Sequence, residues 1–425
     1  MSPSGQKRAC QSVPVDRLSI LPDKAIDNIL MRLPLREAVR TSILAKTWRY
    51  IWCRLPQLEL DESLWNLSQS SDPTPRFKDI VYHFLTLHEG PVTKFTLSIP
   101  NLKSYPKLDN LIYFLSRNDI QHLVLELPPV PGDRYKLPPS IFTCLQLRNL
   151  TLESCLIPLP PPAFKGFDKL ISLELSYVKI PSKFLKSLIS SCPLLDKLVL
   201  RLAESSYVIE INAPMLKSFH FFGDIRCICL KTIPRLSKLS LWCCEYLERS
   251  GKFDIAKFFE PISDLDDLHL DNHCVEFLAR VGGAVSKRLP FDLNCVKRLY
   301  LHCSYLGKLD IISCAFCLIR SFPCLQYMEI KVVDYNDNNI PALECLEVEA
   351  FSDVIFDHLR EVKLRNTVGS KREMQLIKLL LAKSPVLVKM VIEASWFVKT
   401  SATIKILKEL TKFQRASPRA EVVYR

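Results

Sequence analysis

LRNLTL, residues 147–152, is a six-residue pattern that returns throughout this chain of 425 residues. Its alternating leucines indicate a short strand with one buried face, and the leading leucine packs at the turn into that strand. Thirteen such hexamers, with conservative substitutions, recur at a mean spacing of about 25 residues, which excludes a chance origin. They begin at residues 92, 120, 147, 170, 195, 216, 236, 265, 296, 325, 343, 359 and 387.

This spacing predicts an irregular leucine-rich-repeat solenoid, because such repeats are 20 to 29 residues long. In two units the residue after the pattern fits the Asn/Cys position of the repeat, namely Cys155 and Cys244. Helical or irregular segments connect the strands. The clearest is a predicted helix from Ser182, its expected N-cap, to a stop at Pro193. Its buried stripe is Phe184, Leu185, Leu188 and Ile189.

Stacked repeats leave one strand face open, which is the usual binding face of a solenoid. The register of the hexamers predicts which side chains point outward there. Large aromatic residues and arginine are frequent anchors of protein interfaces, so these positions are candidate target contacts. The candidates are His220, Phe222, Trp242, Arg298, Tyr300, His302 and Tyr327, followed by Glu329, Glu347 and Glu349. Burial of some of them under loops is an equally open interpretation.

The composition excludes several functional classes. Ten glycines form no phosphate-binding loop, which argues against nucleotide enzymes. The net charge of +12 is scattered and interrupted by acidic residues, so we expect neither a nucleic-acid partner nor a membrane partner. Without a visible secretory signal, the sixteen cysteines are expected to be free thiols in a reducing compartment. We expect the cytosol or the nucleus, and the sequence does not decide between them.

The segment LPDKAIDNILMRLPLREAVRTSILAKTWRYIW, residues 21–52, carries three apolar stripes at helical spacing. Pro22 and Pro34 suit helix starts, so three short helices are predicted. The stripes are Ile26, Ile29, Leu30 and Leu33; Leu35, Ala38, Val39, Ser42 and Ile43; and Trp48, Ile51, Trp52 and Leu55. So small a bundle needs further burial to be stable. The pattern leaves open whether the rest of this chain or a partner chain supplies it.

The same segment resembles the F-box. The matching residues are Leu21-Pro22-Asp23, Ile29-Leu30, Arg32-Leu33-Pro34, Ala38-Val39, Thr41 to Leu44 and Trp48 to Trp52. The tail resembles the plant FBD region at 358–364, 376–395 and 415–424. Together with the repeats, the order resembles plant F-box/FBD/LRR-repeat proteins. The corresponding domains are an F-box over 14–60, a linker over 61–76, leucine-rich repeats over 77–340 and an FBD region over 341–425.

The resemblance implies that the chain is a substrate-recognition subunit of a Skp-cullin-F-box ubiquitin ligase. Its F-box would dock on a Skp-type adaptor, which bridges to a cullin-RING ligase, and its repeats would bind a target protein whose identity the sequence does not give. The adaptor contacts carried over from the family are Leu21, Pro22, Ile29, Leu30, Leu35, Val39 and Trp48.

The tail is predicted to contain a helix over 372–383, a strand over 387–392, a helix over 404–411 and a closing strand over 421–424. Because an open solenoid end exposes apolar core, capping is the favoured interpretation of the FBD region, and partner binding is the lesser one.

Three other functions were considered: an enzyme, a metal-binding protein and a repeat protein without the ligase role. No nucleophile stands in a recognisable catalytic setting, so no catalytic residue and no cofactor is predicted. Cys314 and Cys317 with Cys324, or His269 and His273 with Cys274, have ligand-like spacing, but neither is strong enough to predict a metal site. A leucine-rich-repeat scaffold or small-ligand receptor that acts without the ligase remains the alternative function.

Overall fold

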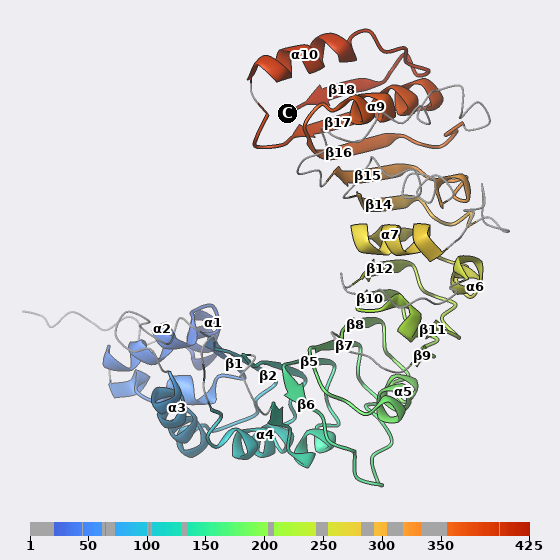
Figure 1. Cartoon of the computed structure of the whole chain (residues 1–425). Coiled ribbons are helices and arrows are strands. Elements are labelled where there is room, and N and C mark those ends of the chain that lie inside the picture. The colour runs from blue at the N-terminus through green and yellow to red at the C-terminus, as the bar shows by residue number, and fades with distance from the viewer. Residues whose placement is uncertain are drawn as a thin grey trace, which may run out of the picture. The chain divides into compact units, whose positions relative to one another are not determined.

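The computed structural model (Figure 1) divides into two compact units, Met1–Leu147 and Arg148–Arg425. It describes residues 21–44, 46–61, 64, 73–99, 102, 104–128, 134–202, 208–243, 254–281, 293–303, 318–332, 355–398 and 400–425. The hexamer at 343, Glu347, Glu349, Cys244, Cys314 and Cys317 lie outside these ranges, as does most of the predicted linker. None of the helices within them combines the length and apolar character needed to cross a membrane.

The first unit opens with two short α-helices, α1 (Asp23–Leu30) and α2 (Leu35–Arg40). Pro22 and Pro34 precede them in the extended conformation, which confirms the predicted starts. The predicted third helix is wrong. The third stripe lies instead in two 3-10 turns, η2 (Lys46–Trp48) and η3 (Ile51–Arg54). The second turn ends at Leu55, which is extended before Pro56. Another 3-10 turn, η1 (Thr41–Ile43), follows α2.

A small core holds these turns together. It consists of Ile26, Leu30, Ala38, Trp48, Ile51 and Leu55, with Leu21 and Trp52 packed at its margin. Ile29, Leu33 and Ile43 belong to the apolar stripes and are exposed. The core has one inner side, and Ile29 is turned about 100° from Leu30 around the helix. Part of the apolar stripes is therefore left uncovered by the described residues of this chain.

The rest of the first unit is a strand–helix alternation. The strands β1 (Gln57–Asp61), β2 (Lys94–Ser98) and β3 (His122–Glu126) pair in parallel without a register shift. Between them lie α3 (Thr74–Leu87) and α4 (Leu108–Ser116), followed by β4 (Tyr135–Lys136) and η5 (Pro139–Thr143). Strand β1 was not predicted; all but its last residue, Asp61, lies in the range assigned to the F-box.

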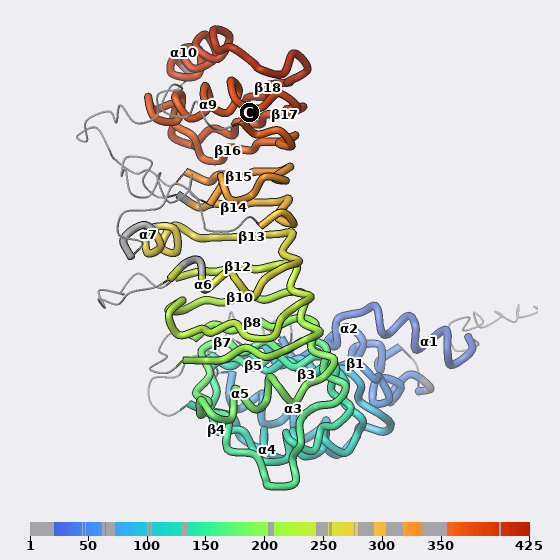
Figure 2. The backbone as a smooth tube through the Cα atoms, turned by 90° about the vertical axis from the view of Figure 1, so that its right-hand side faces the viewer, coloured from blue at the N-terminus to red at the C-terminus, as the bar shows by residue number. Residues whose placement is uncertain are grey.

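The second unit is a ladder of parallel strands, stacked one above the next in Figure 2. Its order is β5-β7-β8-β10-β12-β13-β14-β15-β16-β17-β18. The bounds are β5 Asn149–Glu153, β7 Ser172–Ser176, β8 Lys197–Arg201, β10 Ser218–Phe222, β12 Lys238–Trp242, β13 Asp267–Leu270, β14 Arg298–Cys303, β15 Tyr327–Val332, β16 Glu361–Thr367, β17 Lys389–Ala394 and β18 Glu421–Tyr424. Each described hexamer forms a strand that starts at its third residue, which confirms the predicted repeat.

Each strand buries its leucine positions and turns the residues between them outward, as in β15 with its strict alternation. The connecting helices are α5 (Ser182–Ser190), α6 (Ile255–Phe259) and α7 (Asn272–Val281). The predicted stripe of α5 is buried as expected, but Pro181 occupies its N-cap position and Ser182 makes no capping bond. Several short elements outside the ladder were not predicted. They are strand β6 (Cys155–Leu156), the 3-10 turn η6 (Ile225–Cys227), and strand β9 (Ile209–Ile211), which pairs with β11 (Ile228–Leu230).

The C-terminal region continues the same ladder. Strand β16 pairs with β15 on one side and with β17 on the other, and β18 closes the series. Helix α9 (Lys371–Lys383) follows β16, and α10 (Thr400–Leu410) follows β17. The four elements predicted for the tail are therefore confirmed to within a few residues.

Candidate interaction surfaces

The N-terminal turns expose a group of large apolar side chains. Ile43 is 85% exposed, Tyr50 62% and Leu44 61%. Ile29, Met31, Leu33 and Val39 are each exposed by close to two fifths. Scattered exposed apolar residues are ordinary, but so many within 22 consecutive residues are not. The segment therefore offers an apolar surface that the described residues of this chain leave uncovered.

The predicted adaptor contacts divide into two groups. Pro22, Ile29 and Val39 are exposed, and Leu21 and Leu35 are partly buried. Leu30 and Trp48, in contrast, lie inside the small core, with 0% and 3% of their surfaces exposed. These two residues support the exposed surface from beneath.

Sequence reasoning missed the most exposed members of this surface. Ile43 was placed in an apolar stripe but, like Met31, Leu44 and Tyr50, was not selected as an adaptor contact. No local signal separates these residues from buried ones, because adjacent apolar side chains can both be buried, as Phe184 and Leu185 are on α5.

A charged contact fixes the ends of the segment to each other. The Arg54 guanidinium lies 3.3 Å from the carboxylate of Asp27 and 3.5 Å from that of Asp23, both on α1. The last 3-10 turn is thereby tied to the first helix. These charged groups are partly exposed to solvent, so the ion pairs contribute little to stability. Their main effect is to orient the last 3-10 turn against α1.

The second candidate surface is the outward face of β10 to β15. Every predicted target contact in this set lies at an outward strand position. Trp242 and Arg298 are exposed, while His220, Phe222, Tyr300, His302 and Tyr327 are partly buried. The structure thus places the predicted set on one face, with most members half covered by their neighbours.

Aromatic contacts run across the strands of this face. The His269 and Tyr300 rings stack at 3.9 Å between centroids, and Tyr300 lies 5.3 Å from Tyr327. Trp242 meets His302 edge-on at 5.2 Å. His269 was not among the predicted target contacts, although its place in LDDLHL marked it as outward. Its register with Tyr300 on β14 produces the stack.

Burial lowers the pKa of the three histidines on this face. For His269 the pKa falls to about 4, mainly through desolvation and secondly through the charge of Lys238. The pKa values of His220 and His302 are lowered for the same first reason, with nearby lysines contributing. At neutral pH these rings are therefore uncharged, and the centre of the face is aromatic and neutral.

Ion pairs balance the charges around this neutral centre. Arg298 pairs with Asp266 at 2.8 Å and also with Asp267. Arg365 on β16 pairs with Glu329 at 3.2 Å and with Glu393 at 3.1 Å. Because these pairs cross neighbouring strands, they fix the long side chains at the rim of the aromatic rows.

The ligand-like histidine spacing does not produce a cluster. His269 points outward from β13, whereas Cys274 is fully buried in the first turn of α7. Within the described ranges the group with metal-ligand atoms close together is Cys243, Asp271 and Cys274. The spacing of residues in the sequence did not reveal this group, because Cys243 follows a different strand, β12.

In sequence order, a short helical segment with an exposed apolar surface precedes a ladder of parallel leucine-rich strands, and this order defines a class of repeat proteins. Comparison with known proteins identifies the family within that class. Residues 18–59 match the F-box domain family, and residues 108–330 match the leucine-rich repeats of FBD-associated F-box protein At5g56370. The chain is 33% identical over 423 residues to F-box/FBD/LRR-repeat protein At1g13570 of Arabidopsis thaliana, covering 96% of this chain and 98% of the relative.

Putative F-box/FBD/LRR-repeat protein At4g03220 of Arabidopsis thaliana is 25% identical, covering 96% of this chain and 95% of the relative. F-box/LRR-repeat protein 13 of the same plant is 25% identical, with 98% of each chain covered. The chain therefore belongs to the F-box/FBD/LRR-repeat family, and its domains are those of ubiquitin-ligase substrate adaptors.

Proposed function

We propose that this chain is the substrate-recognition subunit of a Skp-cullin-F-box ubiquitin ligase. The observation that carries the proposal is the uncovered apolar surface around Ile43 and Leu44, within the segment that matches the F-box. In this function a Skp-type adaptor covers that surface and links the chain to a cullin-RING ligase.

The size of the surface suits such a partner. A standard interface buries about 800 Å² on each side, and its energy comes mainly from a few apolar or aromatic anchors at the centre. Ile43, Leu44 and Tyr50 are the most exposed large side chains of this segment. Leu21, Pro22, Ile29, Leu35 and Val39 complete the proposed contact set. Leu30 and Trp48 keep the turns in place.

The target protein is proposed to bind the outward face of β10 to β15. Half-buried aromatic rings that pack against one another are already ordered before binding, so little side-chain entropy is lost on contact. Transfer of ubiquitin belongs to other subunits in this function, so the chain itself needs no catalytic residue and no cofactor. Nucleic acid and membranes are not proposed as partners, and the proposed compartment is the cytosol or the nucleus.

The C-terminal FBD region is proposed to cap the repeats. Its strands β16 to β18 continue the hydrogen-bonded ladder, and the apolar face of α9 is almost wholly buried. An end of this kind covers the apolar core that the last repeat would otherwise expose.

Titration calorimetry of the purified chain with a Skp-type adaptor tests the ligase function. The wild type is expected to bind, and the double substitution Ile43→Ala with Leu44→Ala is expected to weaken binding by about tenfold or more. Both side chains are exposed, so the fold should be unaffected. Leu21→Ala with Pro22→Ala tests the other edge of the same surface.

Leu159→Ala is the matched control, because Leu159 is 69% exposed but lies among the repeats. It should bind the adaptor as the wild type does. A folded wild type that does not bind would overturn the ligase function and leave a repeat scaffold or small-ligand receptor.

A further inference from the structure

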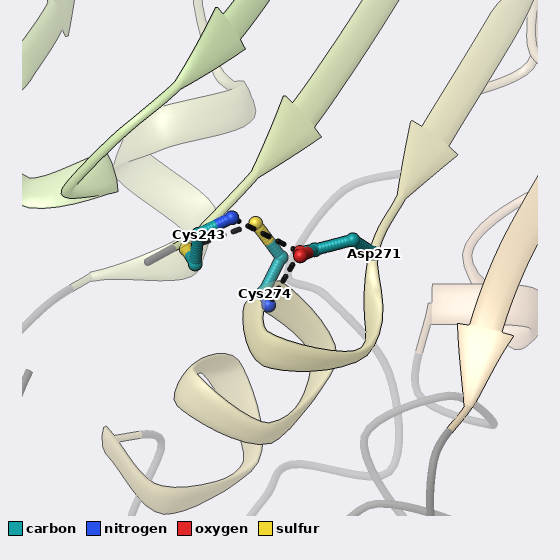
Figure 3. Close-up of side chains that lie close together, drawn as sticks. All are labelled: Cys243, Asp271 and Cys274. Carbon is teal, nitrogen blue, oxygen red and sulfur yellow. Dashed lines mark hydrogen bonds between the residues drawn. The ribbon is translucent and has the colours of Figure 1, made fainter. Parts of the chain in front are cut away.

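Two cysteine thiols are buried side by side behind the aromatic face. Cys243 follows the last residue of β12, and Cys274 lies in the first turn of α7. Their sulfur atoms are 2.9 Å apart although the residues are 31 positions apart in sequence. Both are free thiols, exposed by 3% and 0%. Figure 3 shows the Cys274 side chain turned toward Cys243.

Asp271 fixes both cysteines at the backbone. Its Oδ1 atom accepts hydrogen bonds from the N–H of Cys243 at 3.1 Å and from the N–H of Cys274 at 2.8 Å (Figure 3). The second bond is the capping bond of α7, three residues along the chain. One buried carboxylate therefore holds the end of a strand and the start of a helix in register, so the sulfur atoms meet without any further movement of the backbone.

The separation of the sulfur atoms favours a disulfide over a metal. Two thiolates on one tetrahedral zinc, each about 2.3 Å from the ion, are about 3.8 Å apart, which is wider than the distance here. A disulfide needs about 2.05 Å, so a small side-chain rotation is enough. The Asp271 oxygen is also committed to two backbone hydrogen bonds, and the cluster provides three ligands where structural zinc takes four.

We propose that Cys243 and Cys274 are a redox site that forms a reversible disulfide with hydrogen peroxide as the oxidant. The Cys243 thiolate attacks one peroxide oxygen, the O–O bond breaks, and hydroxide leaves, giving a sulfenic acid. The Cys274 sulfur then attacks the Cys243 sulfur and the S–O bond breaks. The two thiols lose two electrons and two protons in total, and one peroxide becomes two waters.

The surroundings assign the first step to Cys243. Arg226 lies within electrostatic range of that sulfur: the pKa of Arg226 is raised first by its hydrogen bond to Asp224 and to a smaller extent by the nearby Cys227 and Cys243 side chains. The guanidinium sits 5.4 Å from the centre of the Phe277 ring on α7. Cys274 has its pKa raised by complete burial, which suits the thiol that reacts second.

The disulfide would tie the end of β12 to α7 next to Trp242, which meets His302 on the outward face. On the proposed function, oxidation would then hold one edge of the target-binding face in a single position. The redox site itself does not depend on that function, because its test needs neither adaptor nor target.

Peptide mapping of the full chain tests the proposal. The protein is treated with hydrogen peroxide, the remaining thiols are alkylated, and a non-reducing tryptic digest is analysed by mass spectrometry. We expect a linked pair formed by the peptides 239–249 and 258–280, with equal loss of the two alkylated cysteines. Dithiothreitol should restore both. Absence of the link, under conditions that oxidise other thiols of the chain, would overturn the proposal.

Cys244 shares the first peptide, so variants decide which neighbour reacts. Cys244→Ser should keep the link and Cys243→Ser should abolish it; the opposite result would overturn the assignment. Cys192, also buried, is the internal comparison and should stay reduced. Stoichiometric zinc in the purified wild type, with protection of both thiols, would likewise contradict the proposal. The wild-type map stands by itself if a variant fails to fold.

Discussion

His269 shows how a single side chain combines structure and titration on the outward face. Its position in the hexamer predicted that it points outward, and that is confirmed. Its stack on Tyr300 and its low pKa follow instead from the register of β13 with β14, which joins residues 31 positions apart in sequence. Leu30 and Trp48 illustrate the same limit, because matching a family motif does not say which side chain of a small core stays exposed.

His269→Gln should reduce the loss of stability in acid. The folded-state pKa of about 4 lies below the ordinary value of 6.5, so the unfolded chain binds more protons between these values. The folded state is therefore destabilised as the pH falls through this window, by about 1–2 kcal/mol at pH 5 for this ring. Urea unfolding at pH 7 and pH 5 measures the difference. His358→Gln, at an exposed site, is the control, and an equal acid loss in both variants would contradict the prediction.

Helix starts show at the scale of elements why sequence rules succeed in one place and fail in another. Ser182 and Ser370 both begin apolar helical patterns. Ser370 caps α9 in a reciprocal box with Glu373: each side chain bonds the other's backbone N–H, at 3.3 Å and 2.8 Å. Ser182 instead falls inside α5, because Pro181 takes the N-cap position. The apolar spacing predicts a helix in both cases, but the cap depends on backbone angles that the pattern does not specify.

Ser370→Ala should therefore lower the free energy of unfolding by about 1 kcal/mol, the usual effect of removing a cap. Ser182→Ala is the matched control and should change stability by less than about 0.5 kcal/mol, since no capping bond is lost. Chemical denaturation of the two variants measures both values. Equal effects would mean that the box around α9 contributes little.

For the whole molecule, the repeat made most of the ladder predictable, but its first strand was missed. The twelve hexamers within the described ranges each specify where a strand begins, because each places its buried leucines at the same spacing. Strand β1 was missed although LPQLEL, residues 55–60, has the pattern of the repeat, because its leading Leu55 was assigned to the third helical stripe. The uncovered apolar surface was also only partly foreseen, since which side of a small helix stays bare depends on packing between elements.

Ending the chain after residue 415 should cause self-association. This removes β18, whose Glu421 and Arg425 N–H groups bond to β17 and its preceding turn at 2.9 Å. Strand β17 would become an open edge, and open edges pair with other chains. Sedimentation velocity should show larger species than for the full chain. Arg419→Ala in the full chain, an exposed change within the segment that the truncation removes, should behave as the wild type does; a truncated chain that sediments identically would contradict the prediction.

The bare side chains around Ile43 have a consequence for the life of the protein after synthesis. Every copy made without a free adaptor would expose this apolar surface in the cell, where chaperones and proteases bind such surfaces. On the proposed function, the amount of this chain would then be limited by the supply of its adaptor: surplus copies would be cleared, and the recognition subunit would persist mainly as part of a complete ligase.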